Sequence, residues 1–329
     1  MRPALGHARF RLLATAALCL GASLVLPPVS LERPVYDLLF LVDITGSMMV
    51  RDVAVDGAPA SRLDATRTAL RRAIAALPCR SRVGLAIFTE RQPVLLISPT
   101  ELCDGYAPLD AAIAGLDRRM AWEGDSRIFS GLARALPMAG GLEADLVFLT
   151  DGHEAPPARA DRPPVYDGRP GAVGGMLVGV GGYELAPIPR YDDEGREIGF
   201  YAMGEVEQEN REGAPPEGMA EREGFNPRNA PYGGAMAEGT EHMSSVKEGY
   251  LRELARFTGL AYAHLDDPSA LAGLIEAHAT RHPQPTAVGI GAFPAAMALL
   301  LLAIVYLGLP LAERWRRAAG PDPAIARIS

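Results

Sequence analysis

The stretch Asp37-Leu-Leu-Phe-Leu-Val-Asp-Ile-Thr-Gly-Ser47 decides the fold. Its apolar run begins near Val35, ends at Asp43, and is apolar at successive rather than alternate positions. A run of this kind, too short for a helix, is typical of a strand buried on both faces of a parallel sheet. We therefore expect a central strand that delivers the residues after Val42 to the carboxyl edge of the sheet.

Strand and helix patterns alternate along the rest of the chain. A capping box at Ser61-Arg-Leu-Asp64 predicts a helix that ends before Pro78. Further strands are expected at Val83–Phe88, Val94–Ser98, Leu146–Leu149, Met176–Val180 and Leu260–Leu265, and further helices at Leu109–Leu116, Ile128–Met138, Tyr250–Phe257 and Ser269–Ala279. The alternation predicts an α/β fold, doubly wound, with a mostly parallel sheet and one antiparallel edge strand. Functional residues are expected at the carboxyl ends of the strands.

One segment, residues 183–245, does not follow this alternation. Its first part, up to Tyr201, predicts a hairpin that turns at Glu194-Gly195. The remainder is acidic, rich in Gly and Pro and poor in branched residues, so we expect a mobile insertion.

Two apolar runs near the ends predict membrane helices. Residues 286–311 carry no Asp, Glu, Lys or Arg and exceed the length of about 20 residues that spans a bilayer. The tail, residues 312–329, is basic and is therefore expected in the cytoplasm. Residues 1–28 combine arginines with the apolar run Leu12–Leu26, which is typical of either a cleaved signal peptide or a short anchor. Both alternatives place residues 33–281 outside the cytoplasm, in the periplasm of a bacterium with the inner membrane as anchor.

The overall charge excludes one class of partner. The 329 residues include 32 basic and 40 acidic side chains, and the formal net charge is -8. Binding to phosphate backbones needs concentrated Lys and Arg, so the composition argues against nucleic-acid binding.

The cysteines agree with an exported domain. Cys19 lies in the N-terminal apolar run, which leaves Cys79 and Cys103 as one pair in an oxidising compartment. A disulfide between these two is expected, with two free thiols as the alternative.

Oxygen-bearing side chains gather where strands end. Asp43, Thr45 and Ser47 alternate along the loop after the first strand, where three oxygens can face one Mg²⁺ or Ca²⁺ ion. An Asx-type turn is the alternative interpretation of this spacing. Ser126 precedes a predicted helix and Asp151 ends a later strand, and both face the same edge of the sheet. Together these residues predict a site for a divalent cation.

This order of residues resembles the metal-ion-dependent adhesion site of von Willebrand factor A domains, over residues 35–279. The resemblance implies that Ser47 and Ser126 are ligands, with Thr45 in the same loop. It implies that Asp43 and Asp151 bind directly or through water. Thr45 stands where the family usually has Ser, and Ser126 where it usually has Thr; each keeps the hydroxyl.

Two more carboxylates lie next to these motifs in the sequence. Asp125 directly precedes Ser126, and its role is either to raise the affinity for Ca²⁺ or to cap a helix in solvent. Glu154 is a second candidate for an auxiliary role.

Several short runs are similar to the A-domain accessory proteins of bacterial methanol oxidation, the MxaL type. They are Arg51-Asp52, Ser61-Arg-Leu63, Leu77-Pro-Cys79, Val83-Gly-Leu85, Phe88-Thr-Glu90, Cys103, Met120-Ala-Trp122, Gly124-Asp-Ser126, Thr150-Asp-Gly152 and Glu154-Ala-Pro-Pro157. Members of that group are held to assist maturation of the periplasmic methanol dehydrogenase, including its Ca²⁺ acquisition. The membrane-anchored aerotolerance-type A-domain proteins of the cell-envelope stress response share the topology and are the alternative.

The motifs favour binding over catalysis. Ser47 is not part of a Gly-x-Ser-x-Gly elbow, and the sequence has neither a Walker loop nor a His-Glu-x-x-His motif. His153 is the histidine expected nearest the site, on a surface loop. We therefore expect a module without enzymatic activity whose metal accepts a carboxylate from a protein partner, such as a periplasmic dehydrogenase or its accessory proteins. A metal-dependent hydrolase is a further alternative.

Overall fold

The computed structural model describes residues 2–121, 125–157, 165–192, 194–206 and 239–318. Residues Pro34–His282 form one compact unit, and the two ends of the chain, Met1–Arg33 and Pro283–Ser329, form another. The first unit differs by one residue at each end from the segment 33–281 that the sequence assigns to one domain.

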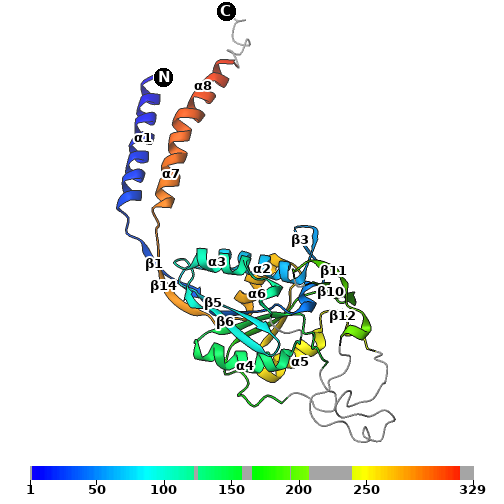
Figure 1. Ribbon diagram of the computed structural model, residues 1–329. Helices are drawn as coiled ribbons and strands as arrows, with labels where there is room; N and C mark the ends of the chain where they lie inside the picture. Colours follow the sequence, from blue (N-terminus) through cyan, green and yellow to red (C-terminus); the bar gives the residue numbers. More distant parts are fainter. Residues whose placement is uncertain (1, 122–124, 158–164, 193, 207–238, 319–329) are drawn as a thin grey trace, which may run out of the picture. The chain divides into compact units, whose positions relative to one another are not determined.

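A six-stranded sheet forms the centre of the larger unit (Figure 1). In spatial order its strands are β13 (Ala261–His264), β8 (Gly175–Gly179), β7 (Asp145–Thr150), β2 (Asp37–Asp43), β5 (Arg82–Thr89) and β6 (Gln92–Glu101). All neighbours are parallel except β5 and β6, which pair antiparallel at one edge. The predicted mostly parallel sheet with one antiparallel edge strand is therefore confirmed.

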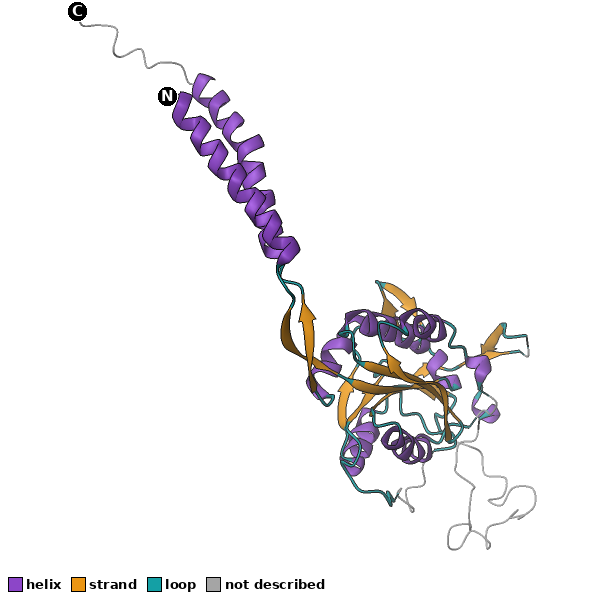
Figure 2. Ribbon diagram, turned by 90° about the vertical axis from the view of Figure 1, so that its left-hand side faces the viewer, coloured by secondary structure: helices purple, strands orange, loops and turns teal. Residues whose placement is uncertain are grey.

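Helices cover both faces of the sheet (Figure 2). One face carries α2 (Arg62–Ala76), α3 (Tyr106–Ala114) and α6 (Leu271–His278), and the other carries α4 (Ile128–Gly141) and α5 (Glu248–Thr258). Alternate residues of β2 serve the two cores: Phe40 packs in the first and Leu41 in the second, both fully buried. This two-sided burial explains why the strand is apolar at every position. Ser61 caps α2 by accepting a hydrogen bond from the backbone N–H of Asp64 (3.1 Å), as the capping box predicts.

The insertion contains regular structure at both of its ends. β10 (Pro189–Tyr191) and β11 (Glu197–Phe200) form the expected antiparallel hairpin, and β9 (Ala186–Pro187) pairs with β12 (Met243–Ser244). Gly195 turns the hairpin with φ 82°, a conformation that favours glycine. The hairpin is thus as expected, whereas β12 contradicts the expectation of a mobile segment at the returning end, because backbone pairing with β9 fixes it. Residues 207–238 of the insertion lie outside the described residues.

Shorter elements connect the larger ones. They are the hairpin β3 (Val53–Val55) and β4 (Ala58–Ala60), and the 3₁₀ turns η1 (Gly46–Met49), η2 (Arg118–Met120), η3 (Met203–Glu205) and η5 (Pro268–Ala270).

The smaller unit contains two apolar helices joined to a two-stranded ladder. Its elements are α1 (Arg2–Val25), β1 (Val29–Val35), β14 (His282–Val288), α7 (Ala292–Ala303), the π-helical segment η6 (Ile304–Gly308) and α8 (Leu309–Ala318). Residues His7–Val25 and Ala292–Trp315 are long and apolar enough to cross a membrane. Within this unit α1 packs against α7, with Ala16 and Ala298 buried and Arg9 paired with Glu313 at 2.6 Å.

The C-terminal apolar run is not helical throughout. The predicted helix began at residue 286, but β14 continues to Val288 and the helix begins at Ala292. Gly289 and Gly291 lie between the two elements, where their low helix propensity separates strand from helix. The absence of charge alone does not mark that boundary.

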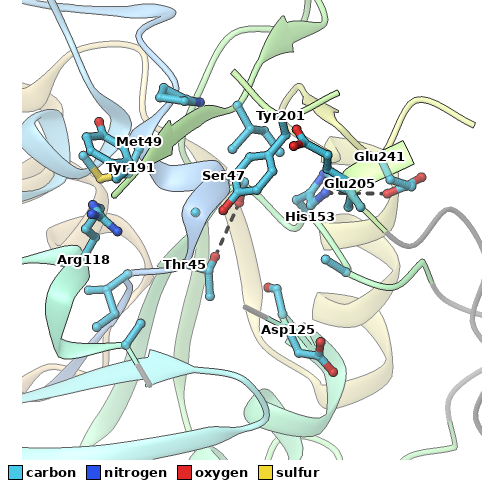
Figure 3. Close-up of a pocket in the computed structure, with 18 of the residues that line it drawn as sticks. Thr45, Ser47, Met49, Arg118, Asp125, His153, Tyr191, Tyr201, Glu205 and Glu241 are labelled. Atoms are coloured by element: carbon cyan, nitrogen blue, oxygen red, sulfur yellow. Dashed lines mark hydrogen bonds and ion pairs between the residues drawn. The ribbon is translucent and has the colours of Figure 1, made fainter. Parts of the chain in front are cut away.

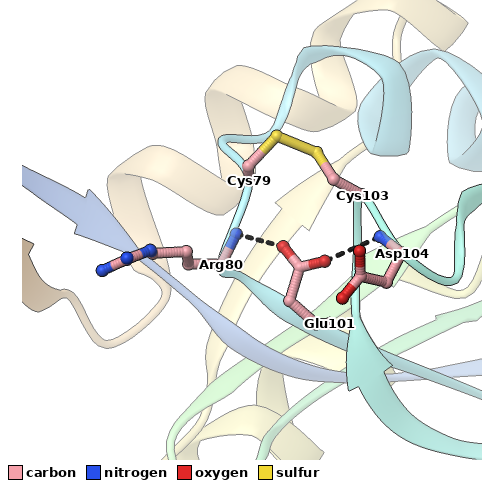
Figure 4. The surroundings of a disulfide bond; sticks show 5 residues. All are labelled: Cys79, Arg80, Glu101, Cys103 and Asp104. Atoms are coloured by element: carbon pink, nitrogen blue, oxygen red, sulfur yellow. Dashed lines mark hydrogen bonds between the residues drawn. A yellow bond between two sulfur atoms is a disulfide. The ribbon is translucent and has the colours of Figure 1, made fainter. Parts of the chain in front are cut away.

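A disulfide joins Cys79 to Cys103, with 5.3 Å between their Cα atoms (Figure 4). It links the loop after α2 to the loop after β6. Next to it, the Glu101 carboxylate accepts hydrogen bonds from the backbone N–H groups of Arg80 and Asp104. Cys19 is a free cysteine in α1. The expected pairing is thus present.

Replacing both Cys79 and Cys103 by Ser should lower the free energy of unfolding by about 3 kcal/mol, because the bond closes a loop with a sequence separation of 24. Chemical denaturation of the full chain in detergent measures this change. Cys19→Ala is the control and should leave the transition unchanged. An equal transition for the double variant and the wild-type protein would show that the disulfide does not stabilise the fold.

Candidate metal centre

The two acidic residues predicted at strand ends lie at the same edge of the sheet. Asp43 is the last residue of β2, and Asp151 directly follows β7. The two strands are parallel neighbours, with Val42 opposite Leu149. Both aspartates are 0% exposed. The register of the sheet therefore brings together two like charges that have no contact with solvent.

Hydrogen bonds to the Asp43 carboxylate shape the loop that follows β2. Its Oδ1 accepts from the backbone N–H of Thr45 (2.9 Å) and from the Thr45 hydroxyl (2.7 Å), and its Oδ2 accepts from the Thr150 hydroxyl (2.6 Å). The first of these bonds is the Asx-type turn considered as the alternative to metal binding. The turn does not exclude a metal, because it also places the hydroxyls of Thr45 and Ser47 3.5 Å apart on one side of the loop.

The environment of Asp43 opposes its ionisation. Burial, followed by the negative charge of Asp151, raises the pKa of Asp43 from 3.8 to about 7. Hydrogen bonds from Thr150 and Thr45 lower the pKa but do not offset these two effects. A cation beside Asp43 would favour its charged form, so the arrangement is short of positive charge without one.

Asp151 has the opposite electrostatic balance. Burial raises its pKa, but the charge of Arg62, a hydrogen bond from the His153 backbone (2.9 Å) and one from Ser47 together hold the pKa below its usual range. Arg62 pairs with Oδ2 of Asp151, and the Ser244 hydroxyl donates to the same oxygen (3.0 Å). Asp151 is therefore charged and already has one cationic partner inside the protein.

Arg62 is the functional residue that the sequence motifs did not identify. Its side chain is 0% exposed and also binds the Asp52 carboxylate, with 2.6 Å between Nη2 and Oδ2. It donates to the hydroxyl of Ser244 (2.8 Å), in the returning end of the insertion. Gly181, at φ 123°, lies against the guanidinium so closely that a Cβ there would collide with it. In the sequence, Arg62 lies inside a capping box, where a charged residue is usually solvated. The sequence therefore offers no reason to expect its burial.

Ser126 reaches the same edge from the start of α4. Its backbone pairs with Ala155 in both directions (2.7 and 2.8 Å), and this bridge ties the segment to the loop after Asp151. Gly131 lets α4 approach the sheet, because a Cβ there would overlap the ring of Phe88. The Ser126 hydroxyl is buried and has no hydrogen-bond partner among the described residues. A buried hydroxyl without a partner is costly and indicates a missing ligand.

The three predicted hydroxyl residues line one cavity of about 480 Å³ (Figure 3). Thr45, Ser47 and Ser126 contribute to its lining, whereas the buried Asp43 and Asp151 do not. The remaining lining residues are Ile44, Gly46, Met49, Arg118, Ala121, Asp125, His153, Ala155, Pro156, Ile188, Pro189, Tyr191, Tyr201, Glu205, Val206 and Glu241. Three hydroxyl-bearing residues therefore line the cavity, whereas Asp43 and Asp151 are buried outside its lining.

The candidate auxiliary residues have different surroundings. Asp125 lines the cavity and pairs with Arg127 at 3.2 Å. Glu154 does not line it, because its carboxylate accepts hydrogen bonds from the backbone of Phe129 (2.9 Å) and the hydroxyl of Tyr250 (2.6 Å). Burial raises the pKa of Glu154.

The expected surface position of His153 is wrong. The residue is 2% exposed and lines the cavity, because the loop after β7 turns inward at Gly152 with φ 74°. Burial lowers its pKa, although the charge of Asp151 acts in the other direction. Its Nε2 lies 3.6 Å from the Glu241 carboxylate.

The donor set fits a small hard cation. Mg²⁺ and Ca²⁺ prefer oxygen ligands, and three hydroxyls and two carboxylates meet that preference. Among the described residues no three His, Cys, Asp or Glu side chains gather as a metal site, which argues against a zinc-type site. Thr45, Ser47 and Ser126 would hold the ion, with Asp43 and Asp151 supplying negative charge behind them.

Comparison with known proteins agrees with this fold. The family model of the von Willebrand factor type A domain matches residues 38–153, which contain β2, Ser126 and Asp151. The larger unit therefore has the von Willebrand factor type A fold over these residues, and the chain also has two helices that are long and apolar enough to cross a membrane. A search of the curated proteins yields no match.

Three solved structures illustrate the similarity of fold. An aerotolerance-related membrane protein from Bacteroides fragilis is 15% identical with a TM-score of 0.45, over 74% of this chain and 97% of that one. A von Willebrand factor type A protein from Catenulispora acidiphila is 13% identical with a TM-score of 0.39, over 77% of this chain and 45% of that one. The PilB minor pilin from Streptococcus sanguinis is 15% identical with a TM-score of 0.35, over 74% of this chain and 60% of that one. Similarities of this size do not bear on function.

Asp43→Asn and Asp151→Asn should change the stability of the metal-free protein in opposite directions. The pKa of Asp43 is raised in the fold, so its ionisation destabilises the domain progressively as the pH rises from 3.8 through about 7. Asp43→Asn removes this loss and should be more stable than the wild-type protein above about pH 7, but not near pH 4. Asp151→Asn leaves the buried Arg62 short of negative charge and should destabilise by about 3 kcal/mol.

Thermal denaturation in chelator across this pH range measures both effects. Two variants that are destabilised equally at every pH would contradict the assignment of unequal charge states to the pair.

Proposed function

We propose that residues 34–282 form a metal-dependent protein-binding module without enzymatic activity. Mg²⁺ or Ca²⁺ would bind to Thr45, Ser47 and Ser126, in the arrangement of a metal-ion-dependent adhesion site. The cation supplies an open coordination position that attracts a carboxylate from a partner. The chain's own residues hold the ion, orient the open position toward the cavity and limit access to it.

The observation that carries this proposal is the Ser126 hydroxyl. It is buried, lacks a hydrogen-bond partner among the described residues, and lines the same cavity as Thr45 and Ser47. Beneath the hydroxyls lie two carboxylates, of which Asp151 has a buried cationic partner and Asp43 has none among the described residues. A divalent cation would satisfy the hydroxyl and stabilise the charged form of Asp43 together.

Among the described residues of the cavity, no serine hydroxyl is paired with a histidine base. A serine nucleophile needs a base within hydrogen-bond distance, and neither ring nitrogen of His153 makes a hydrogen bond to a hydroxyl of the cavity. His153 lies instead beside Glu241. The arrangement therefore favours binding over hydrolysis.

The proposed location is the bacterial inner membrane, with the domain in the periplasm. Arg314 and the arginines that follow it flank the second apolar helix, and Arg9 and Arg11 flank the first. The pairing of Arg9 with Glu313 places these two flanks at the same end of the helix pair. Positive flanks at one end favour the cytoplasm for that end.

The proposed role is that of an accessory or maturation factor for a periplasmic metalloenzyme, such as methanol dehydrogenase, in Ca²⁺ insertion or assembly. Support comes from the short runs similar to the MxaL type, and from the disulfide between Cys79 and Cys103. A role like that of the aerotolerance-type proteins is the alternative, and the identity of the captured partner separates the two.

Mg²⁺ or Ca²⁺ should stabilise the wild-type protein by about 2.7 kcal/mol when present at 100 times its dissociation constant. Ser126→Ala should remove most of this gain, because it deletes one ligand without changing the charge. Ser130→Ala, a matched change in α4 outside the cavity lining, should retain it. Thermal unfolding in chelator and in added metal measures the gain. A Ser126→Ala variant with the full gain would exclude the proposed ligand set.

Partner capture should depend on the same hydroxyl. The full chain, purified in detergent and immobilised, should retain a periplasmic protein in Mg²⁺ or Ca²⁺ and release it into chelator. Ser126→Ala should retain little of it and Ser130→Ala should behave as the wild-type protein, as quantified by mass spectrometry of the eluates. Retention that persists in chelator would show that capture does not use the metal. A metalloenzyme among the metal-dependent proteins would support the maturation role.

A further inference from the structure

The hairpin of the insertion forms one side of the cavity at the candidate metal centre. Pro189 and Tyr191 of β10, with Tyr201 after β11, line the wall of the cavity that faces Ser47 (Figure 3). An ion pair of Arg51 with Glu197, at 2.5 Å, attaches the hairpin to the segment after η1. The wall is therefore attached to the domain.

The size of the cavity restricts which groups can reach the proposed metal. The hydroxyl cluster lies in a cavity of about 480 Å³, within the range of about 300–1,000 Å³ typical of pockets for small ligands. A flat protein face cannot enter a space of this size. The group that reaches the open coordination position must therefore come on a narrow segment, such as an extended peptide.

The cavity is also electrically polar. Arg118 lies at one end, beside Tyr191, whereas Glu205 and Glu241 lie at the other, beside His153 (Figure 3). Thr45 and Ser47 lie between the two ends, and the third carboxylate of the lining, Asp125, is paired with Arg127. Charge complementarity of this kind fixes the orientation of a bound segment. Acidic groups would be attracted to the Arg118 end and repelled from the other.

Arg118 is held in a position to bind an anion. Its guanidinium carbon lies 3.9 Å from the centre of the Tyr191 ring, a cation–π contact that holds the guanidinium beside the ring. No ion pair joins it to a carboxylate of the described part of the chain, in contrast to the neighbouring Arg119, which pairs with Asp117 at 3.0 Å. A planar guanidinium matches a carboxylate in geometry as well as in charge.

We propose that the cavity binds an extended acidic peptide segment of a partner, which presents one carboxylate to the metal centre and a second to Arg118. This inference rests on the proposed function and adds the chemistry of the partner. Arg118 is then a specificity-determining residue, because it selects a second acidic group on one side of the carboxylate that reaches the metal.

A pool of short synthetic peptides with a fixed central Asp and random neighbours tests the proposal. The full chain in detergent, with Mg²⁺ present, should enrich peptides that carry a second Asp or Glu on one side of the fixed residue. Arg118→Glu should reverse the preference and enrich Lys or Arg at that position. Arg119→Ala, a neighbour outside the cavity lining, should keep the wild-type preference.

One enriched peptide then gives the affinity. Arg118→Ala should weaken its binding by about tenfold or more, the usual effect of losing a charge-assisted hydrogen bond. The stabilisation of Arg118→Ala by Mg²⁺ should stay that of the wild-type protein, since Arg118 is not a metal ligand.

The possible failures are distinguishable. If the wild-type protein binds Mg²⁺ but recovers no peptide, or recovers peptides without a second acidic residue, the inference about the partner is wrong while the metal site stands. An unchanged preference in Arg118→Glu has the same meaning. If thermal unfolding shows no metal binding at all, the proposed function fails and this inference fails with it.

Discussion

Two carboxylates buried at adjacent strand ends impose the constraint on which the site depends. Asp43 and Asp151 are both inaccessible to solvent, and like charges in such an environment repel strongly. Hydrogen bonds to Asp43 from Thr45 and Thr150 offset part of this repulsion, and Arg62 offsets another part at Asp151. The repulsion between these two carboxylates is therefore offset by three segments. They are the loop after β2, the first turn of α2 and the end of β7.

Arg62 links the buried carboxylates to the insertion. Its guanidinium contacts Asp151, Asp52 and Ser244, so one side chain connects a strand end, the segment before β3 and the returning end of the insertion. Removing one carboxylate partner of a buried arginine strongly destabilises a protein, because it leaves a buried charge uncompensated. The position of β12 is thus coupled to the charge at the candidate metal centre. The described ends of the insertion contribute residues to this candidate site.

The sequence predicted what depends on local pattern. The apolar run before Asp43 and the alternation of strands and helices placed Thr45, Ser47, Ser126 and Asp151 at one sheet edge, because parallel strands align their carboxyl ends. The cavity walls depend on contacts between distant segments that no local pattern records.

Arg62, Tyr191 and His153 illustrate the limit. Arg62 belongs to a helix cap, where charged residues are usually solvated, and the sequence around His153 carries no sign of burial. Tyr191 belongs to a predicted hairpin, but the sequence does not show that this hairpin lines the cavity. The arrangement of hydroxyls and carboxylates explains why the other residues that line the cavity matter for partner selection. Ser47 and Ser126 line the cavity while the carboxylates of Asp43 and Asp151 lie outside its lining, so a cation bound by these two serines would direct charge at the cavity. That charge would attract any carboxylate, and discrimination among partners must therefore come from the walls.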